Sequence, residues 1–382
     1  MRIGVVGMGL RGGLAFLAHR PEQDIRVVAL ADPDEGVYAR FREKVGDDAY
    51  VTDDVRRLAE QQLDAVFVLS PDDLHEEHAC LFLEAGVPVY LEKPMAITIE
   101  GCDRILQTAM RTRTRLYLGH NMRHFQVVRK MKEWIDKGMI GNVKTAWCRH
   151  FVSYGGDAYF CDWHADSQRS TGLLLQKGAH DIDVLHWLCG GYSRQVVGMG
   201  DLMVYGDLPH RRQPGEKHRV QFTDIWPPKN LRNLNPVIDV EDVNLMLMRL
   251  DNGVLASYQQ CMFTPDAWRN YTVIGDEGRI ENFGDSPGSC KVCLWDVRRQ
   301  EPTLTYDVPH ATGGHGGSDT LIVDEFLRFV REGGKTETSP VAARMAVAAG
   351  YMATCSVRGG AQPQEVPGLD PDVVRYFDEG QV

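Results

Sequence analysis

The stretch IGVVGMGLRG, residues 3–12, joins a short apolar run to three closely spaced glycines, and a helical pattern follows it as far as His19. A strand that enters such a turn and leaves it as a helix is typical of the phosphate-binding loop of a dinucleotide-binding β-α-β unit. Gly7 permits the tight turn, Gly9 lets the backbone approach a pyrophosphate, and Gly12 allows the helix to pack on the strand. The stretch therefore predicts that a dinucleotide is bound at the start of the chain.

Asp32 closes the next apolar run, twenty residues after Gly12. A carboxylate there can accept hydrogen bonds from both hydroxyls of the adenosine ribose and would repel a 2′-phosphate, which predicts NAD rather than NADP. Asp32 could instead be a plain turn residue. Arg11 and Arg40 weaken the preference for NAD, since a guanidinium could offset the repulsion. Leu10 and Arg11 complete the loop and are expected among the cofactor contacts.

Short Val-, Ile- and Leu-rich runs alternate with helical patterns from Arg2 to Gly119, which is typical of a parallel sheet with crossover helices. The strand candidates are Ile3 to Val6, Val27 to Ala31, Ala49 to Val51, Ala65 to Leu69, Val87 to Leu91 and Leu116 to Leu118. Six strands predict a doubly wound Rossmann sheet, and we assign residues 1–122 to this NAD-binding domain.

A different pattern begins after Gly119, and we assign residues 123–382 to an α/β domain with an open, largely antiparallel sheet. Its strand candidates are Val143 to Phe151, Val196 to Val204, Asp242 to Leu250, Val254 to Cys261, Asn270 to Gly275 and Gly278 to Asn282. Helices are expected at Val127 to Lys137, Leu173 to Leu188, Thr320 to Arg331 and Pro340 to Ser356, of which the C-terminal ones could pack back on the first domain. A polar, Pro-rich stretch between Leu208 and Val237 predicts a long surface segment.

Composition excludes several classes of function. The net charge of −11 comes without a Lys/Arg stripe, so nucleic acid is not an expected partner, and no apolar run is long enough to span a membrane. Nine cysteines form no disulfide framework, and the pair Cys290 and Cys293 lacks the further ligands of a metal site. The strand at Ile3 leaves no room for a signal peptide, which predicts a cytoplasmic protein.

Two further motifs follow the strands of the first domain. Ser70-Pro71-Asp72-Asp73-Leu74-His75 comes after the fourth strand, and Glu92-Lys93-Pro94 ends the fifth. With the glycine loop, the Trp163-His164 region and Gly178-Ala179-His180, they make nearly the whole chain resemble the glucose–fructose oxidoreductase, inositol dehydrogenase and MocA (Gfo/Idh/MocA) family.

This resemblance implies an active site between the two domains, with Lys93 and His180 on either side of a sugar or polyol hydroxyl beside the nicotinamide. It also implies that the open sheet serves oligomer contacts, so we expect a homodimer or homotetramer. The further cofactor contacts that it implies are Ser70, Pro71, His75, Glu92 and Lys93.

The chemistry of alcohol oxidation suits Lys93 and His180. The hydroxyl must lose a proton while hydride leaves the same carbon; imidazole suits proton transfer, and an ammonium stabilises a developing alkoxide. Which of the two is the formal base stays open. The alternatives are a solvated surface lysine and a structural helical histidine. Asp183 lies one turn after His180 and could orient its imidazole or cap a buried donor.

The sequence departs from the polyol-dehydrogenase pattern at Gln176, where the family carries an aspartate that shares in proton transfer. Glutamine can bind substrate but cannot take a proton. Lys177 adds a cation that the simpler pattern lacks and is expected to bind substrate, with a solvated surface lysine as the alternative. The further residues expected to bind substrate are Arg149, Trp163, His164, Arg169 and His315, each with a packing or surface role as the alternative.

Three functions follow from these observations. The first is an NAD-dependent oxidoreductase that transfers hydride between a secondary hydroxyl of a sugar, sugar derivative or cyclitol and nicotinamide. The second is an NAD-dependent glycoside hydrolase that works by transient ring oxidation and elimination, which Gln176 and Lys177 favour. The third is a non-catalytic dinucleotide sensor, against which the presence of both Lys93 and His180 speaks.

Overall fold

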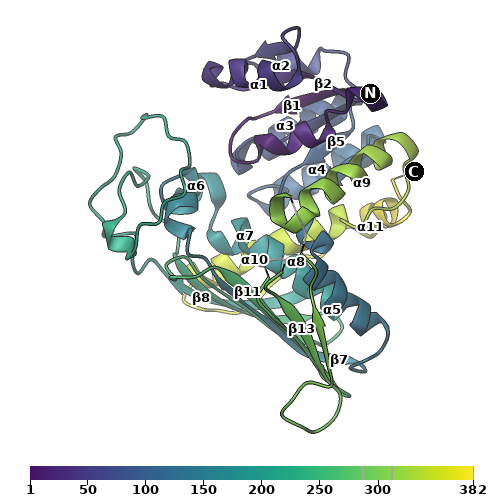
Figure 1. The fold of residues 1–382 in the computed structure, drawn as a ribbon, viewed down its shortest axis with the longest axis vertical. Coiled ribbons are helices and arrows are strands. Elements are labelled where there is room, and N and C mark those ends of the chain that lie inside the picture. The colour runs from purple at the N-terminus through teal and green to yellow at the C-terminus, as the bar shows by residue number, and fades with distance from the viewer. Residues whose placement is uncertain (286–287, 311–312, 382) are drawn as a thin grey trace. The chain divides into compact units, whose positions relative to one another are not determined.

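The computed structural model describes residues 1–285, 288–310 and 313–381, and the chain forms two compact units. Unit 1 combines Met1–Asn121 with Gly313–Arg344 and Leu369–Val382. Unit 2 combines Met122–Thr312 with Met345–Gly368. Figure 1 traces how the C-terminal third of the chain contributes to both units.

Unit 1 is built on a six-stranded parallel sheet with the order β3-β2-β1-β4-β5-β6. The strands are β1 (Arg2–Val6), β2 (Arg26–Ala31), β3 (Tyr50–Thr52), β4 (Ala65–Val68), β5 (Val89–Leu91) and β6 (Leu116–Leu118). Every residue of β4, β5 and β6 is buried, as strands covered on both faces require. The predicted doubly wound sheet is confirmed, and its order places the switch point between β1 and β4.

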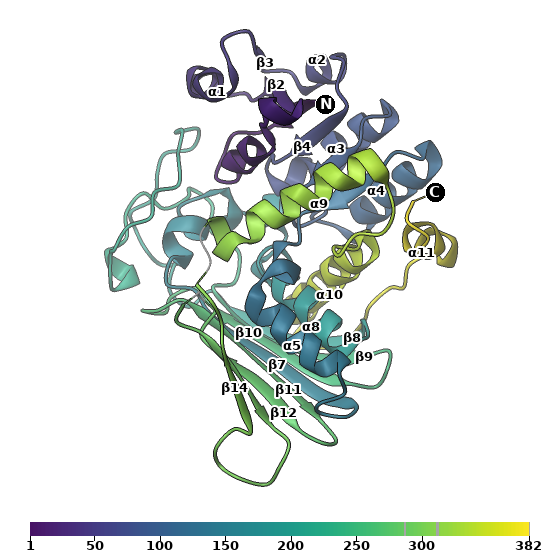
Figure 2. The same ribbon diagram turned by 45° about the vertical axis from the view of Figure 1, so that its right-hand side comes forward.

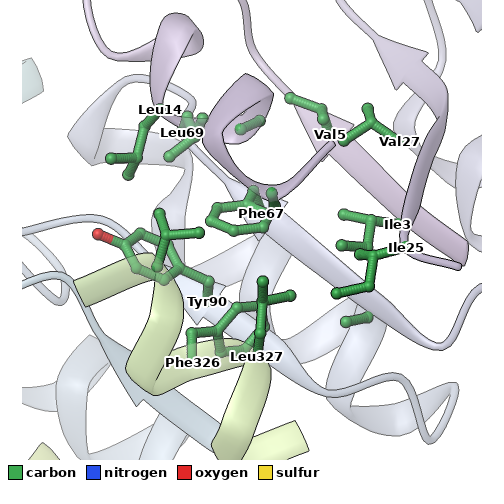
Figure 3. Close-up of a cluster of buried hydrophobic side chains, with 14 of the residues drawn as sticks. Ile3, Val5, Leu14, Ile25, Val27, Phe67, Leu69, Tyr90, Phe326 and Leu327 are labelled. Atoms are coloured by element: carbon green, nitrogen blue, oxygen red, sulfur yellow. The ribbon is translucent and has the colours of Figure 1, made fainter. Parts of the chain in front are cut away.

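Helices cover the sheet of unit 1. They are α1 (Tyr38–Val45), α2 (Val55–Ala59), α3 (His75–Glu84), α4 (Ile99–Thr112), α9 (Ser318–Glu332) and α11 (Pro371–Asp378). The segment after the phosphate loop, Gly12–Ala18, is a 3₁₀-helix rather than an α-helix. In α9, apolar residues recur at helical spacing, and Phe326 packs edge-on against Phe67 and Tyr90 (Figure 3), with ring centroids 5.1 and 5.5 Å away. The helix thereby completes the core of unit 1.

Unit 2 is built on a nine-stranded sheet with the order β14-β13-β12-β11-β7-β10-β9-β8-β15. The strands are β7 (Val143–Phe151), β8 (Ser193–Asp201), β9 (Val243–Leu250), β10 (Leu255–Cys261), β11 (Trp268–Gly275), β12 (Arg279–Phe283), β13 (Lys291–Trp295), β14 (Leu304–Asp307) and β15 (Gln364–Glu365). Only β7 and β10 pair in parallel, so the expected largely antiparallel sheet is confirmed. The sequence did not predict β13, β14 or β15.

One face of this sheet is covered by helices of unit 2. The sheet is contacted by α5 (Gln126–Asp136), α8 (Gly178–Cys189) and the second part of α10 (Pro340–Arg358). The short helices α6 (Ser167–Ser170) and α7 (Leu173–Gln176) precede α8 in the chain. Helices α5 and α8 contact each other and lie against the sheet (Figure 2). Along β9, Met246 and Met248 are buried while Leu245 and Leu247 are exposed, so the opposite face is open within unit 2.

The segment between β8 and β9 contains little regular structure, as its proline content predicts, and only Pro228–Asn230 forms a 3₁₀ turn among its residues. Its ends are anchored in a small core in which the rings of Phe160 and Tyr205 stack at 4.2 Å. In its middle, Thr223 donates its backbone N–H to Asp157 at 2.6 Å. The 208–237 segment is therefore attached to the part of unit 2 that precedes α6.

Candidate functional site

The phosphate loop of unit 1 has the geometry that its glycines predict. Gly7 has φ +90°, and a Cβ on it would lie 2.8 Å from the carbonyl oxygen of Leu69. A Cβ on Gly9 would meet no atom within 4 Å, so that position faces open space. A Cβ on Gly12 would lie 3.0 Å from the sulfur of Met8. Gly7 is thus required by the protein itself, whereas Gly9 leaves room for a ligand.

Asp32 lies at the carboxyl end of β2 beside this loop. One carboxylate oxygen accepts the backbone N–H of Met8 at 2.7 Å, and the other accepts that of Asp34 at 2.8 Å. An ionised carboxylate offers about four acceptor positions, so two remain for ribose hydroxyls. The loop and Asp32 therefore fit the diphosphate and ribose of a dinucleotide.

Arg11 binds carboxylates of the protein rather than projecting freely from the loop. Its guanidinium forms a bidentate pair with Asp319 in the first turn of α9, with both distances 3.0 Å, and its Nε donates to Glu92 at 3.2 Å. Burial alone would lower the pKa of Arg11, but the carboxylates of Glu92 and Asp319 outweigh it and raise the pKa. The charge of Arg11 is therefore compensated within unit 1.

His315 joins the same cluster. Its Nδ1 lies 2.9 Å from a carboxylate oxygen of Asp319, and Asn121 donates its side-chain N–H to the same carboxylate at 3.1 Å. Burial would raise the pKa of Asp319, but hydrogen bonds from His315 and Arg11 hold it well below its ordinary value. The structure thus places His315 beside the phosphate loop, although the sequence suggested a substrate contact.

The two strand-end motifs of unit 1 are tied together by His75. Its Nδ1 lies 2.7 Å from the carbonyl oxygen of Pro94, and its Nε2 lies 2.9 Å from that of Ser70. The Ser70 hydroxyl lies 2.9 Å from His78. Lys93 is half-buried between Glu92 and Pro94, and its peptide bond to Pro94 is cis. Pro71 is half-buried, and Leu10 is 58% exposed at the tip of the phosphate loop.

Helices α7 and α8 of unit 2 carry Gln176, Lys177 and His180, all three buried. The helix that the sequence predicts over 173–188 is broken at Lys177, because α7 ends at Gln176 and α8 begins at Gly178. The Asp183 carboxylate accepts two hydrogen bonds from the Arg123 guanidinium, at 2.8 and 2.7 Å. Asp183 thus caps a buried donor, one of the two roles expected for it.

Asp181 is the centre of a buried polar network beneath α8. Its carboxylate accepts hydrogen bonds from Arg269 at 2.8 Å, from the Tyr258 hydroxyl at 3.0 Å and from the Tyr271 hydroxyl, and it lies 3.0 Å from His150 Nδ1. Burial would raise the pKa of Asp181, but Arg269 and His150 hold it far below its ordinary value. Burial and the charge of Arg269 lower the pKa of His150 to about 3.

Lys177 lies at the edge of this network. Its Nζ is 3.2 Å from the Tyr154 hydroxyl, and it lies 5.4 and 5.5 Å from the ring centres of Tyr154 and Tyr159. Burial and the charge of Arg269 lower the pKa of Lys177 to about 7. An amine with such a pKa exchanges protons near neutral pH, which an exposed lysine does not.

An aromatic series continues from Tyr159. Its ring meets that of His164 edge-on at 5.1 Å, His164 stacks on Trp163 at 3.7 Å, and the guanidinium of Arg169 lies 5.2 Å from the Trp163 ring centre. The structure therefore brings Lys177, Trp163, His164 and Arg169 into one connected group.

Arg149 lies elsewhere in unit 2. It is exposed, and its guanidinium donates to Asn270 at 2.8 Å. Its neighbour His150 is buried on the face that α8 covers, because alternate residues of a strand face opposite sides. Arg149 is thus not brought together with His180 and Lys177.

Several polar residues of these clusters were not singled out from the sequence. They are Asp181, Asp319, Arg269, Tyr154, Tyr159, Tyr258 and Tyr271. Asp181 and Asp319 carried a local signal, since each follows a candidate residue, Lys177 or His315, by four positions. The others are brought to the clusters by the tertiary fold.

A doubly wound parallel sheet, a glycine turn open at Gly9 and a carboxylate at the end of β2 define the class of dinucleotide-binding Rossmann proteins. Residues 1–120 match the family model "Oxidoreductase family, NAD-binding Rossmann fold", and residues 132–366 match its "C-terminal alpha/beta domain". The chain belongs to the Gfo/Idh/MocA oxidoreductase family.

Its similarity to individual members of the family is moderate. It is 25% identical over 361 residues to YteT of Bacillus subtilis (strain 168), a match that covers 81% of this chain and 84% of YteT. It is 33% identical over 192 residues to inositol 2-dehydrogenase 2 of Saccharopolyspora erythraea, covering 50% of this chain and 54% of that protein. It is 30% identical over 225 residues to 2,7-anhydro-N-acetylneuraminate hydratase of Mediterraneibacter gnavus, covering 58% and 57%. The chain thus spans little more than half the length of the latter two.

Solved structures share the fold. Levoglucosan dehydrogenase in complex with NADH and levoglucosan superposes with a TM-score of 0.77 at 18% identity, covering 96% of this chain and 99% of that one. Within the described residues, no helix combines the length and apolar character that a membrane span requires.

Proposed function

We propose that the protein is an NAD-dependent oxidoreductase that transfers hydride between a secondary hydroxyl of a sugar, sugar derivative or cyclitol and nicotinamide. The observation that carries this proposal is the phosphate loop with Asp32, whose carboxylate keeps acceptor positions for a ribose while Gly9 faces open space. Relatives named inositol dehydrogenase and a structural neighbour that binds NADH and levoglucosan support the same class of reaction.

The preference for NAD over NADP rests on charge. A 2′-phosphate near Asp32 would need a cation to offset the carboxylate. Arg11, a candidate for that role, is paired with Glu92 and Asp319 and has little charge to spare. Arg40 lies exposed on α1, where solvent screens it.

Bound nicotinamide would supply the acceptor for hydride, and the residues of this chain would manage the proton. We assign to Lys93 the stabilisation of the substrate oxygen as it gains negative charge, because an ammonium suits that task. We assign proton transfer to His180, because Gln176 at the neighbouring turn cannot accept a proton. The two residues belong to different units, so each assignment requires a variant of its own.

A redox-neutral reaction is the second candidate. Gln176 stands where the polyol dehydrogenases of the family carry an aspartate, and one relative is named a hydratase. In such a reaction the cofactor is oxidised and reduced within one turnover, so a glycoside would release its aglycone without net formation of NADH.

A single assay separates the candidates. The protein is incubated with NAD and a panel of free sugars, cyclitols and aryl glycosides, while NADH absorbance and aglycone release are recorded together. The proposed dehydrogenase forms NADH in proportion to substrate consumed, and a hydrolase releases aglycone alone. Failure to bind either NADH or NADPH in calorimetry would refute both.

A further inference from the structure

Lys177 is a buried amine without a carboxylate partner among the described residues. Lys177 is 6% exposed, and its Nζ donates a hydrogen bond to the Tyr154 hydroxyl at 3.2 Å. No carboxylate oxygen of residues 1–285, 288–310 or 313–381 lies within 4.0 Å of Nζ. An isolated buried ammonium is costly, so such an amine either loses its proton or binds an anion.

The carboxylates that act electrostatically on Lys177, those of Asp181 and Asp285, already bind other groups. Asp181 accepts from Arg269, Tyr258 and Tyr271, and Asp285 lies 3.2 Å from the Arg269 guanidinium. Arg269 therefore takes both carboxylates, and its own charge acts against a second cation. The neighbouring strand β7 presents His150, whose pKa lies at about 3, so it adds no charge near neutral pH.

Two aromatic rings also lie near Lys177. The rings of Tyr154 and Tyr159 lie at distances at which a π-face attracts an ammonium. Beyond Tyr159 the aromatic series continues through His164 to Trp163. These groups favour the charged form of the amine but provide no negative charge to pair with it.

We propose that unit 2 binds an acidic sugar or cyclitol, and that the carboxylate of this substrate forms an ion pair with Lys177. The inference rests on the proposed function, since it narrows the substrate of the same site. The pair would be desolvated, and its formation would favour protonation of Lys177. Because the pKa of Lys177 is about 7 without ligand, binding at pH 8 must then take up a proton from solution.

The test is calorimetry on protein saturated with NADH. D-Glucuronate and D-galacturonate are the probes, and D-glucose and D-galactose are their neutral counterparts. Titrations in phosphate and in Tris at pH 8 give the number of protons bound, since the two buffers differ in ionisation enthalpy. We expect at least one uronate to bind about ten-fold or more tightly than its neutral counterpart, with an uptake approaching one proton. At pH 6, where Lys177 is mostly charged already, the uptake should nearly vanish.

Three variants test whether Lys177 is the group that takes up the proton when the uronate binds. Lys177→Met should abolish the preference for the uronate together with the proton uptake. Lys177→Arg should keep most of the preference but take up no proton, because a guanidinium stays charged at pH 8. Lys144→Met changes an exposed lysine of β7 that pairs with Asp276, and this variant should bind as the wild type does. Thermal unfolding of each variant checks that it is folded.

The proposal is overturned if the uronates bind no more tightly than the neutral sugars, if they do not bind at all, or if wild-type binding takes up no proton. A loss of turnover without loss of uronate affinity in Lys177→Met would also overturn it and assign the amine to proton transfer instead. The function proposed above is judged separately, because NADH formation with a neutral sugar would leave it standing while the acidic substrate was excluded.

Discussion

Two single residues, Asp32 and Arg11, bear on the choice between NAD and NADP in opposite ways. Asp32 keeps its negative charge toward the ribose position, whereas Arg11 gives its positive charge to Glu92 and Asp319. Arg11 therefore has no unpaired positive charge to offer a 2′-phosphate beside Asp32. The proposed preference for NAD thus depends on one carboxylate.

Replacement of that carboxylate should change the choice of cofactor. We expect Asp32→Ala to reduce the ratio of NADPH to NADH dissociation constants by about ten-fold or more, because the repulsion of the 2′-phosphate and the ribose hydrogen bonds are both lost. Asp32→Asn removes the charge alone, so its ratio of dissociation constants should lie between those of the wild type and Asp32→Ala. Fluorescence titration with NADH and NADPH measures the ratio, and tighter binding of NADPH by the wild type would contradict the assignment.

Lys93 is expected to contribute far more to turnover than to the affinity for the cofactor, even though the family resemblance also implies a cofactor contact at this residue. Lys93→Ala should lower kcat by about two to four orders of magnitude, since a cation at the developing alkoxide is lost, while the dissociation constant of NADH changes little. Lys44→Ala, at an exposed lysine of α1 in the same unit, serves as the control. Near-normal turnover of Lys93→Ala would remove Lys93 from the mechanism.

Individual residues also mark where sequence reasoning succeeds and where it stops. The glycine loop and Asp32 lie within one β-α-β unit, so spacing alone predicts their juxtaposition. The partners of Asp181 could not be found that way, because Tyr258, Arg269 and Tyr271 lie 77, 88 and 90 positions further along the chain. The sequence predicts a substrate contact at Arg149, but the pattern of β7 does not say which face of the sheet the helices cover.

Helix α9 is the element that connects the C-terminal part of the chain to the phosphate loop. Its apolar face packs on Phe67 and Tyr90, and Asp319 in its first turn holds Arg11. The sequence predicts this helix from its periodicity, but not the pairing with a residue 308 positions earlier.

We expect Asp319→Asn to lower the free energy of unfolding by about 1–3 kcal/mol, because a largely buried bidentate pair is broken while Arg11 stays in place. The wild-type contribution of Asp319 is present above its unfolded pKa, near 3.8, and is lost as the pH falls further, since the folded pKa lies below that value. Urea unfolding at pH 7 measures the change. The control is Asp324→Asn, which changes a residue of the same helix that pairs with Arg20 at the surface. Equal losses of stability in both variants would contradict the prediction.

Strands that form buried apolar runs were predicted from the sequence, whereas an exposed edge strand was not. The six strands of unit 1 are apolar runs, whereas β14 is an edge strand whose residues are nearly all exposed, so it has no alternation to detect. The break between α7 and α8 was missed for a different reason. A Cβ on Gly178 would lie 3.1 Å from the Tyr258 ring, so that the glycine meets a tertiary contact which local sequence does not reveal.

For the whole molecule, the open face of the unit 2 sheet should decide how copies of the chain assemble. Leu247 is 62% exposed in the middle of β9 and is paired across β8 and β10 with Val197 and Ser257. Leu245 and Met199 extend the same exposed surface, which would be costly to leave in water over a large area. We propose that this face forms the contact of a homodimer or homotetramer.

A charge at the centre of that face should therefore dissociate the assembly. Leu247→Lys is expected to shift the mass measured by light scattering after gel filtration toward that of one chain, because a lysine would be desolvated in the contact. Leu321→Lys places the same charge at an exposed position of α9 and should leave the mass unchanged. A wild type that is monomeric at high concentration would exclude the proposed contact.

Buried histidines should make the stability of unit 2 fall in mild acid. The pKa of His150 is lowered to about 3 by burial and Arg269, and burial lowers that of His186 to about 4. The unfolded chain takes up protons at these positions below pH 6.5 while the folded chain does not, so their stabilising contribution is full above that pH and is lost as the pH falls. Between pH 7.5 and pH 5, each of the two histidines should lower the free energy of unfolding, measured with urea, by about 2 kcal/mol. In His186→Asn this loss of stability should be smaller by about 2 kcal/mol. In the control variant His210→Asn, which changes an exposed histidine, the loss should equal that of the wild type. Equal losses in the two variants would contradict the prediction for His186.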